Sequence, residues 1–90
     1  MAILVLEQQF DPPITSEQMN EAAKRVDPCL EQFGASWVRS FVSKDRRKVT
    51  CVFEAPDAEQ VRQAYRSAGV EFESCWPADE YSIDKPSASY

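Results

Sequence analysis

Four residues of this chain carry groups suited to ligand recognition, and they lie in three separate segments. Glu7 follows an apolar N-terminal run, while Trp37 and Arg39 stand two positions apart. Cys51 lies in a later run of alternating apolar residues. A charged side chain that becomes buried needs a partner, so such a set is typical of a ligand pocket or an interface. We therefore predict four ligand-binding residues: Glu7, Trp37, Arg39 and Cys51.

A purely structural role is the simpler alternative for the same residues. Arg39 would then be exposed on an edge strand and Glu7 would lie at a strand end, where charged residues favour solvation and oppose aggregation. Cys51 would pack as a small hydrophobic residue, as free cysteines in mid-strand commonly do. A reactive thiolate would need a nearby cation to lower its pKa, so a redox sensor based on Cys51 stays open as a weaker hypothesis.

The absence of histidine limits the chemistry that the chain can perform. The 90 residues contain none, which removes imidazole general bases, Ser-His-Asp and Cys-His nucleophiles, and His-based zinc sites. We predict no catalytic residue and expect a protein that is not an enzyme. The three cysteines, Cys29, Cys51 and Cys75, are widely spaced, which indicates reduced thiols rather than a secreted disulfide framework.

Charge and hydropathy restrict the partners. Fifteen acidic and ten basic residues give a formal net charge of -5, and such a field repels nucleic acid and anionic lipid. The apolar run at residues 2–6 is too short for a signal peptide or a membrane span. We therefore expect a cytoplasmic protein that binds neither nucleic acid nor membrane.

Hydrophobic periodicity divides the chain into six elements. Alternation with a period of two predicts strands, and apolar spacings of three and four predict helices. The predicted strands are residues 2–10, 35–43, 48–54 and 70–76, and the predicted helices are residues 16–33 and 58–68. Pro28 lies inside the first helix and deletes the hydrogen bond to the Lys24 carbonyl, which predicts a kink or a split.

The order βαββαβ predicts a ferredoxin-like α+β domain, in which two helices cover one face of a four-stranded antiparallel sheet. We assign residues 1–77 to this domain and residues 78–90 to a flexible C-terminal tail, because the tail has little apolar periodicity. Three of the predicted strands carry bulky apolar residues at both odd and even positions, and therefore on both faces of the sheet. The open sheet face would then be a large hydrophobic patch, so we predict a homodimer formed through it.

Two segments resemble a known family. Residues 37–45, WVRSFVSKD, and residues 48–56, KVTCVFEAP, are similar to a pattern found in a bacterial family of short proteins of unknown function, some of them described as nickel-binding or nickel-responsive. The resemblance covers most of residues 2–76 and implies a ferredoxin-like fold, a dimer and metal binding, with nickel as the ion. Nickel favours nitrogen ligands or thiolates. Cys51 is the one matched residue with such chemistry, and we assign no ligand set.

These observations support two functions of different classes. The first is a non-enzymatic dimeric protein that binds a small ligand or responds to a metal, with the ligand unknown. The alternative is a small enzyme of the dimeric α+β-barrel type that holds a small molecule between sheet and helices. Its acid-base chemistry would then fall to Glu7, Arg39 or Tyr65.

Overall fold

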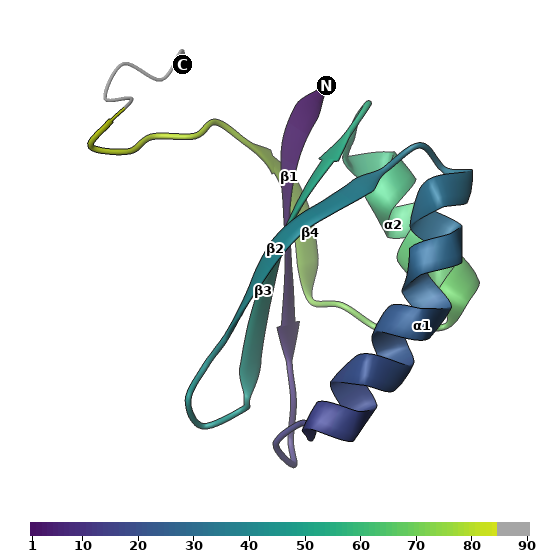
Figure 1. The fold of residues 1–90 in the computed structure, drawn as a ribbon, viewed down its shortest axis with the longest axis vertical. Coiled ribbons are helices and arrows are strands. Elements are labelled where there is room, and N and C mark those ends of the chain that lie inside the picture. The colour runs from purple at the N-terminus through teal and green to yellow at the C-terminus, as the bar shows by residue number, and fades with distance from the viewer. Residues whose placement is uncertain (85–90) are drawn as a thin grey trace.

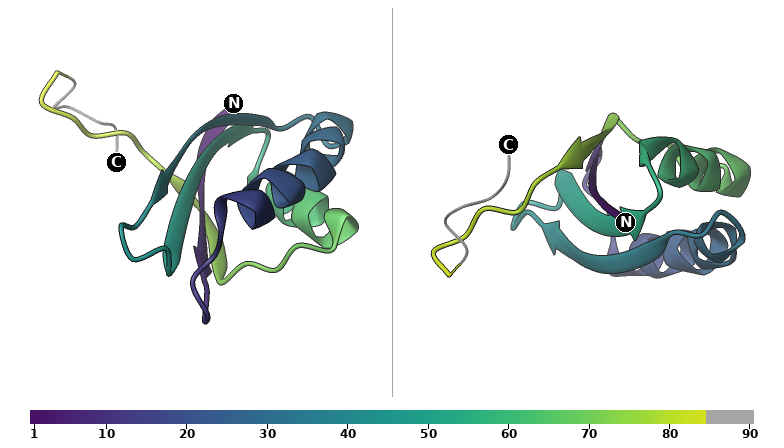
Figure 2. Two further views of the ribbon diagram at one scale, coloured as in Figure 1. Left: turned by 60° about the horizontal axis from the view of Figure 1, so that its bottom comes forward. Right: turned by 90° about the horizontal axis from the view of Figure 1, so that it is seen from above.

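The computed structural model describes residues 1–84 and has the expected element order. The six elements are β1 (Ala2–Gln9), α1 (Ser16–Gln32), β2 (Ser36–Val42), β3 (Lys48–Ala55), α2 (Ala58–Ala68) and β4 (Ser74–Ala78). The strands form one antiparallel sheet in the order β2-β3-β1-β4. Both helices lie side by side on one face of this sheet (Figures 1 and 2). The predicted ferredoxin-like α+β fold is confirmed.

Helix α1 begins at a capping box. The Thr15 hydroxyl accepts from the Gln18 amide at 3.1 Å, and the Gln18 side chain accepts from the Thr15 amide at 2.9 Å. The helix then runs unbroken to Gln32, so the split predicted at Pro28 does not occur. Val26 and Leu30, on either side of Pro28, are buried in the core, and this packing offsets the lost hydrogen bond.

Strand β4 begins four residues later than the sequence predicted. Residues 70–73 connect α2 to the sheet, and Pro77, one residue beyond the predicted strand, lies within β4 and pairs with Leu4. Pro77 can lie within β4 because β4 is at the sheet edge, where it pairs only with β1. An edge strand tolerates proline because one side of its backbone needs no partner in the sheet.

Strand β2 contains a bulge that alternation cannot reveal. Trp37 pairs with Phe53, but Arg39 pairs with Val52, so Val38 is an extra residue. Side chains directly opposite in an antiparallel pair share a face. Trp37 therefore lies on the helix-covered face and Arg39 on the open face, although a strict period of two would place both on one face with Phe41.

The core fills the space between the sheet and the helices. The inward positions of β1 and β3 supply Leu4, Leu6 and Phe53, which are almost completely buried. Val61 and Tyr65 of α2 face them, and the Tyr65 ring contacts the Phe53 ring edge-on with centroids 5.9 Å apart. Leu4 and Leu6 share the inward face of β1, as a period of two predicts, and the structure shows that this face is the one toward the helices.

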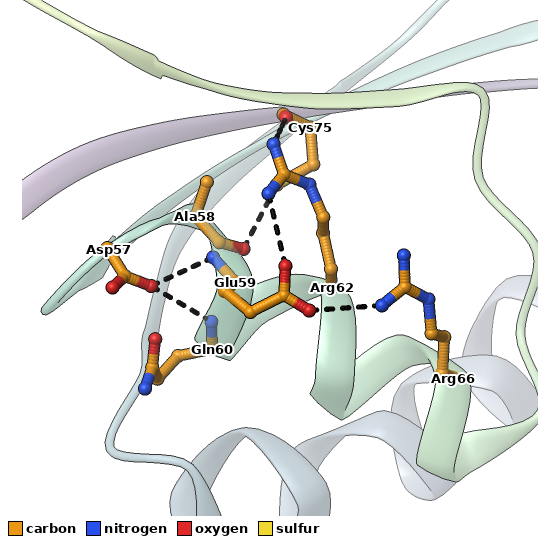
Figure 3. A network of polar contacts seen from close by, with 7 residues as sticks. All are labelled: Asp57, Ala58, Glu59, Gln60, Arg62, Arg66 and Cys75. Carbon is orange, nitrogen blue, oxygen red and sulfur yellow. Dashed lines mark hydrogen bonds and ion pairs between the residues drawn. The ribbon is translucent and has the colours of Figure 1, made fainter.

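Helix α2 is attached to strand β4 by an arginine network (Figure 3). Asp57 caps the helix by accepting from the Glu59 amide at 2.9 Å. The Arg62 guanidinium donates to the Cys75 carbonyl at 2.7 Å and to the Glu59 carboxylate at 3.3 Å. Arg66 donates to the same carboxylate at 3.1 Å. These contacts hold the edge strand against the helix that covers it.

The other sheet face carries no helix (Figure 2). The registers place on it the outward residues of all four strands. Its large apolar members are Ile3, Val5, Phe41, Val52 and Trp76, and its charged members are Glu7, Arg39, Lys48 and Glu54. We call this surface the open face. The apolar patch predicted from the two-sided pattern is therefore present.

The C-terminal segment is described only in part. Ala78 belongs to β4, so the sheet reaches one residue beyond the predicted domain boundary at residue 77. Residues 85–90 of the predicted flexible tail lie outside the described residues. In the part of the chain that is described, no helix combines the length and apolar character needed to cross a membrane.

Gly69 ends α2 at a point of contact with α1. Its φ angle is +70°, and a Cβ there would lie 3.1 Å from Nη2 of Arg25, which donates to the Ala68 carbonyl at 2.7 Å. We expect Gly69→Ala to lower the free energy of unfolding by about 1–2 kcal/mol through left-handed strain, with a further loss from the displaced arginine. Gly34→Ala is the matched control, because its φ is +72° and no atom lies within 4 Å. Urea unfolding of both variants measures the difference, and equal losses would show that the Arg25 contact contributes nothing.

Candidate ligand-binding cleft

A cleft of about 950 Å³ lies between α1 and the sheet. Its helical wall is formed by residues of α1 from Gln18 to Leu30, and its sheet wall by the inward residues of β1, β2 and β3. The connection from Gly69 to Glu73 closes one side. Cavities that hold small molecules are commonly 300–1,000 Å³ and mostly apolar, so this cleft has the size of a small-molecule site.

A line of hydrogen-bonding groups crosses the sheet wall of the cleft. The Trp37 indole N–H donates to the Ser40 hydroxyl at 2.9 Å, and that hydroxyl donates to Sγ of Cys51 at 2.9 Å. The Tyr65 hydroxyl is a further hydrogen-bond partner of the thiol. Because the bulge at Val38 turns Trp37 inward, the line joins neighbouring strands β2 and β3 to helix α2. It is a set of polar anchors within an otherwise apolar wall.

These groups are uncharged at neutral pH. Burial raises the pKa of the Cys51 thiol, although hydrogen bonds from Ser40 and Tyr65 oppose the shift. Burial also raises the pKa of the Tyr65 hydroxyl, and the neighbouring Cys51 adds to the effect. A thiol with a raised pKa is a poor nucleophile. The redox-sensor hypothesis is therefore weakened, because among the described residues no cation contributes to stabilising the Cys51 thiolate.

Alkaline pH is expected to destabilise the fold. Burial raises the pKa values of both Cys51 and Cys75 above the ordinary value of 9.0. The native state therefore keeps protons that the unfolded chain releases. This contribution to stability is complete below pH 9 and is lost as the pH rises toward the native values. Urea unfolding from pH 7 to 10.5 should show a constant free energy followed by a decline, and Cys51→Ala should make the decline shallower, whereas the half-buried control Cys29→Ala should not. A free energy that stays constant to pH 10.5 would contradict this account.

The cleft also contains a buried amide. Gln8 is on the inward face of β1 and is 9% exposed. Its Nε2 donates to the Glu71 carbonyl at 2.9 Å, so the side chain fixes the connection that closes the cleft. Removing this amide would leave the Glu71 carbonyl without this partner.

The structure separates the four predicted ligand-binding residues into two pairs. Trp37 and Cys51 lie in the cleft and are linked through Ser40. Glu7 and Arg39 lie on the open face, where Oε1 of Glu7 accepts from the Trp76 indole at 3.0 Å. No single site therefore contains all four residues.

Sequence reasoning overlooked Ser40 and Gln8. A strict alternation would place Ser40 on the sheet face opposite Trp37, because alternation does not reveal the bulge at Val38. Gln8 follows Leu4 and Leu6 at every second position of β1, so its side chain points to the same inward face. A polar residue at such a position could have indicated a functional role for Gln8. Tyr65 was considered only as a residue of the enzyme alternative.

The donor set does not fit a metal site in one protomer. The chain has no histidine, and residues 1–84 bring together no group of three or more cysteine, aspartate or glutamate side chains. Cys51, the one metal-competent residue of the family pattern, is surrounded instead by Ser40 and Tyr65. Nickel would therefore find one soft ligand and no imidazole here.

The chain is similar to known proteins both in sequence pattern and in fold. A family model described as nickel responsive protein, SCO4226-like, matches residues 5–77. The crystal structure of SCO4226 from Streptomyces coelicolor A3(2) superposes with a TM-score of 0.80 at 17% sequence identity, covering 90% of this chain and 100% of that chain. No curated protein sequence matches this chain. At this level of identity, the structural likeness shows the fold alone.

Proposed function

This chain belongs to the SCO4226-like family of nickel responsive proteins, and we propose that it is a non-enzymatic protein that binds a small molecule in the cleft between α1 and the sheet. The observation that carries the proposal is the cleft itself, with an apolar wall crossed by the line from Trp37 through Ser40 to Cys51. Such a combination holds a ligand by apolar contact and orients it by a few hydrogen bonds. With its three cysteines as free thiols, we place the protein in the cytoplasm.

The enzyme alternative has less support. Acid-base catalysis needs an ionisable group within hydrogen-bond reach of a bound substrate. Glu7 and Arg39 lie on the open face, away from the cleft, and burial raises the pKa of Tyr65. None of the three residues to which acid-base chemistry was assigned is therefore poised for it in the cleft.

A cleft-filling variant tests the proposal. The probe is 1-naphthylmethanol, an uncharged aromatic alcohol, and saturable binding is measured by equilibrium dialysis. Ser40 is half-buried and lines the cleft, so Ser40→Phe should occupy the space and abolish binding. Ser67→Phe, exposed on α2, is the matched control and should bind as the natural protein does. Absence of saturable binding to the natural protein, or equal binding to both variants, would overturn the proposal.

A response to nickel in this family does not require that one protomer coordinates the ion. Residues 1–84 offer no cluster of metal-ligating side chains, so we expect nickel at millimolar excess to leave the melting temperature unchanged. A ligand that binds the native state alone must raise it. The measurement is thermal unfolding with and without nickel chloride, with zinc chloride as the comparison. A rise that Cys51→Ala removes would contradict the expectation and identify the thiol as a ligand.

We further propose that the protein is a homodimer formed through the open face. Val5 and Val52 are neighbours at its centre, with Trp76 beyond Val5 and Arg39 beyond Val52. An exposed apolar surface of this kind is typical of an interface. A closed dimer with two-fold symmetry would cover the same surface on both copies.

The charges of the open face are complementary between two copies. Arg39 makes no ion pair within residues 1–84. Glu7 is held by the Trp76 indole and the Ser74 hydroxyl, and both bonds go to Oε1, so Oε2 is free of them. Arg39 would pair with the partner's Glu7, and the reverse pair would form by symmetry. Light scattering after size exclusion should report a dimer at micromolar concentration, and a monomer would overturn this proposal.

A further inference from the structure

The mouth of the cleft is negatively charged. Five carboxylates line it, and they are Asp11, Glu21, Asp27, Glu71 and Glu73. Asp11 is neutralised by the Arg47 guanidinium at 3.1 Å, but within residues 1–84 no ion pair involves the other four. They are exposed and come from both sides of the opening, α1 and the connection before β4.

Among the described residues, one cationic side chain lines the same cleft. It is Arg25, whose guanidinium donates to the carbonyls of Ala68 and Gly69 at distances of 2.7–3.2 Å. Those bonds hold it at the C-terminal end of α2, where a positive charge is favourable. Four carboxylates that form no ion pair within residues 1–84 therefore face one guanidinium, which is already bound to backbone carbonyls. The electrostatic potential at the mouth attracts cations and repels anions.

The interior of the cleft has a different character. Its walls include five aromatic side chains, which are Phe10, Trp37, Phe53, Tyr65 and Phe72. Aromatic faces accept apolar groups and also attract cations, with Trp the most favourable ring. Trp37 is 57% exposed, so its ring is available to a ligand that enters.

We infer that the ligand of this cleft is an organic cation, a molecule with an aromatic or other apolar body and one positively charged amine. This inference rests on the proposed small-molecule function and adds the class of ligand. The apolar body enters between α1 and the sheet, and the ammonium group stays at the mouth beside Asp27 and Glu71. A carboxylate on the same skeleton would face like charges at that point.

Three probes with one skeleton test the sign of the charge. They are 1-naphthylmethylammonium, 1-naphthylmethanol and 1-naphthoate, measured by equilibrium dialysis at low salt and in 0.5 M sodium chloride. The cation should bind roughly tenfold or more tightly than the anion at low salt, and the difference should shrink in high salt because exposed charges are screened. Binding of none of the three compounds would overturn the proposed function. Binding of the anion as tightly as the cation would overturn this inference and leave the proposed function standing.

Neutralising variants locate the charges responsible. The double variant Asp27→Asn, Glu71→Gln should weaken binding of the cation several-fold and leave binding of 1-naphthylmethanol unchanged. Glu31→Gln, exposed on α1 but outside the cleft lining, is the matched control and should change neither. An equal loss for the cation and the alcohol would mean that the double variant deforms the cleft, and an unchanged cation affinity would mean that these carboxylates do not select the ligand. Either result would overturn the inference.

Discussion

Replacing Phe53 with alanine is expected to lower the free energy of unfolding by about 3–5 kcal/mol. Phe53 is 1% exposed and is among the largest fully buried side chains of the described residues. Its ring meets the Tyr65 ring edge-on at 5.9 Å, and the Tyr65 ring meets Phe72 in the same way at 6.0 Å. The substitution leaves a cavity at one end of this aromatic row and removes a contact between β3 and α2.

Urea or thermal unfolding measures the loss, which should lower the melting temperature by more than about 10 °C in a domain of this size. Phe53→Leu keeps most of the apolar volume and should cost less than about 1.5 kcal/mol, which keeps the test informative if the alanine variant does not fold. Ile83→Ala is the control, since Ile83 is 95% exposed and its loss should stay within about 0.5 kcal/mol. A loss below about 1 kcal/mol for Phe53→Ala would contradict the core described here.

Replacing Val52 with aspartate is expected to convert the proposed dimer to a monomer. Val52 is half-buried at the centre of the open face, between Val5 and Arg39 in the register. In a dimer it would lie under the partner subunit, where an uncompensated charge costs about 3–5 kcal/mol. The dimer dissociation constant should then rise at least about a hundredfold, because each copy brings one such charge.

Sedimentation velocity across a concentration series measures this change in the dimer dissociation constant. Gln63→Asp, exposed on α2 and on the helical side of the molecule, adds the same charge and should leave the dimer intact. Circular dichroism should show a folded chain in both variants, because Val52 lies outside the helix-covered core. A Val52→Asp dimer of unchanged affinity would mean that copies associate through some other surface.

The sequence alone predicts the fold in segments where the spacing of apolar residues fits one type of secondary structure. Leu4 and Leu6 in β1, and Cys51 and Phe53 in β3, alternate strictly and are buried as the alternation predicts. The capping box at the start of α1 and Gly69 at the end of α2 are local signals of the same kind, because capping residues act on the adjacent helix end. Alternation, caps and turn residues all depend on neighbours close in sequence.

The cleft could not be predicted in the same way, because it depends on contacts between distant elements. One extra residue at Val38 reverses the face of Trp37, and a bulge of this kind leaves no trace in composition. The bond from Ser40 to Cys51 follows from the pairing of β2 with β3. The cleft volume follows from how closely α1 approaches the sheet, which no local pattern encodes.

The open face and the cleft lie on opposite sides of one sheet. The inward residues of β3, such as Cys51, line the cleft, and the outward residues, such as Val52, lie in the proposed interface. A dimer formed through the open face would therefore leave both clefts accessible. This arrangement gives each copy its own binding site and assigns Trp76 and Trp37 to different roles.

The position of the bound ligand is the most direct test of the central claim. Amide and indole resonances of nitrogen-15-labelled protein are followed by NMR during titration with 1-naphthylmethylammonium. We expect the largest shifts at the Trp37 indole N–H and at the amides of Ser40, Cys51 and Phe72, all of which line the cleft. Shifts concentrated instead at Val5, Val52 and the Trp76 indole would place the ligand on the open face and contradict the account.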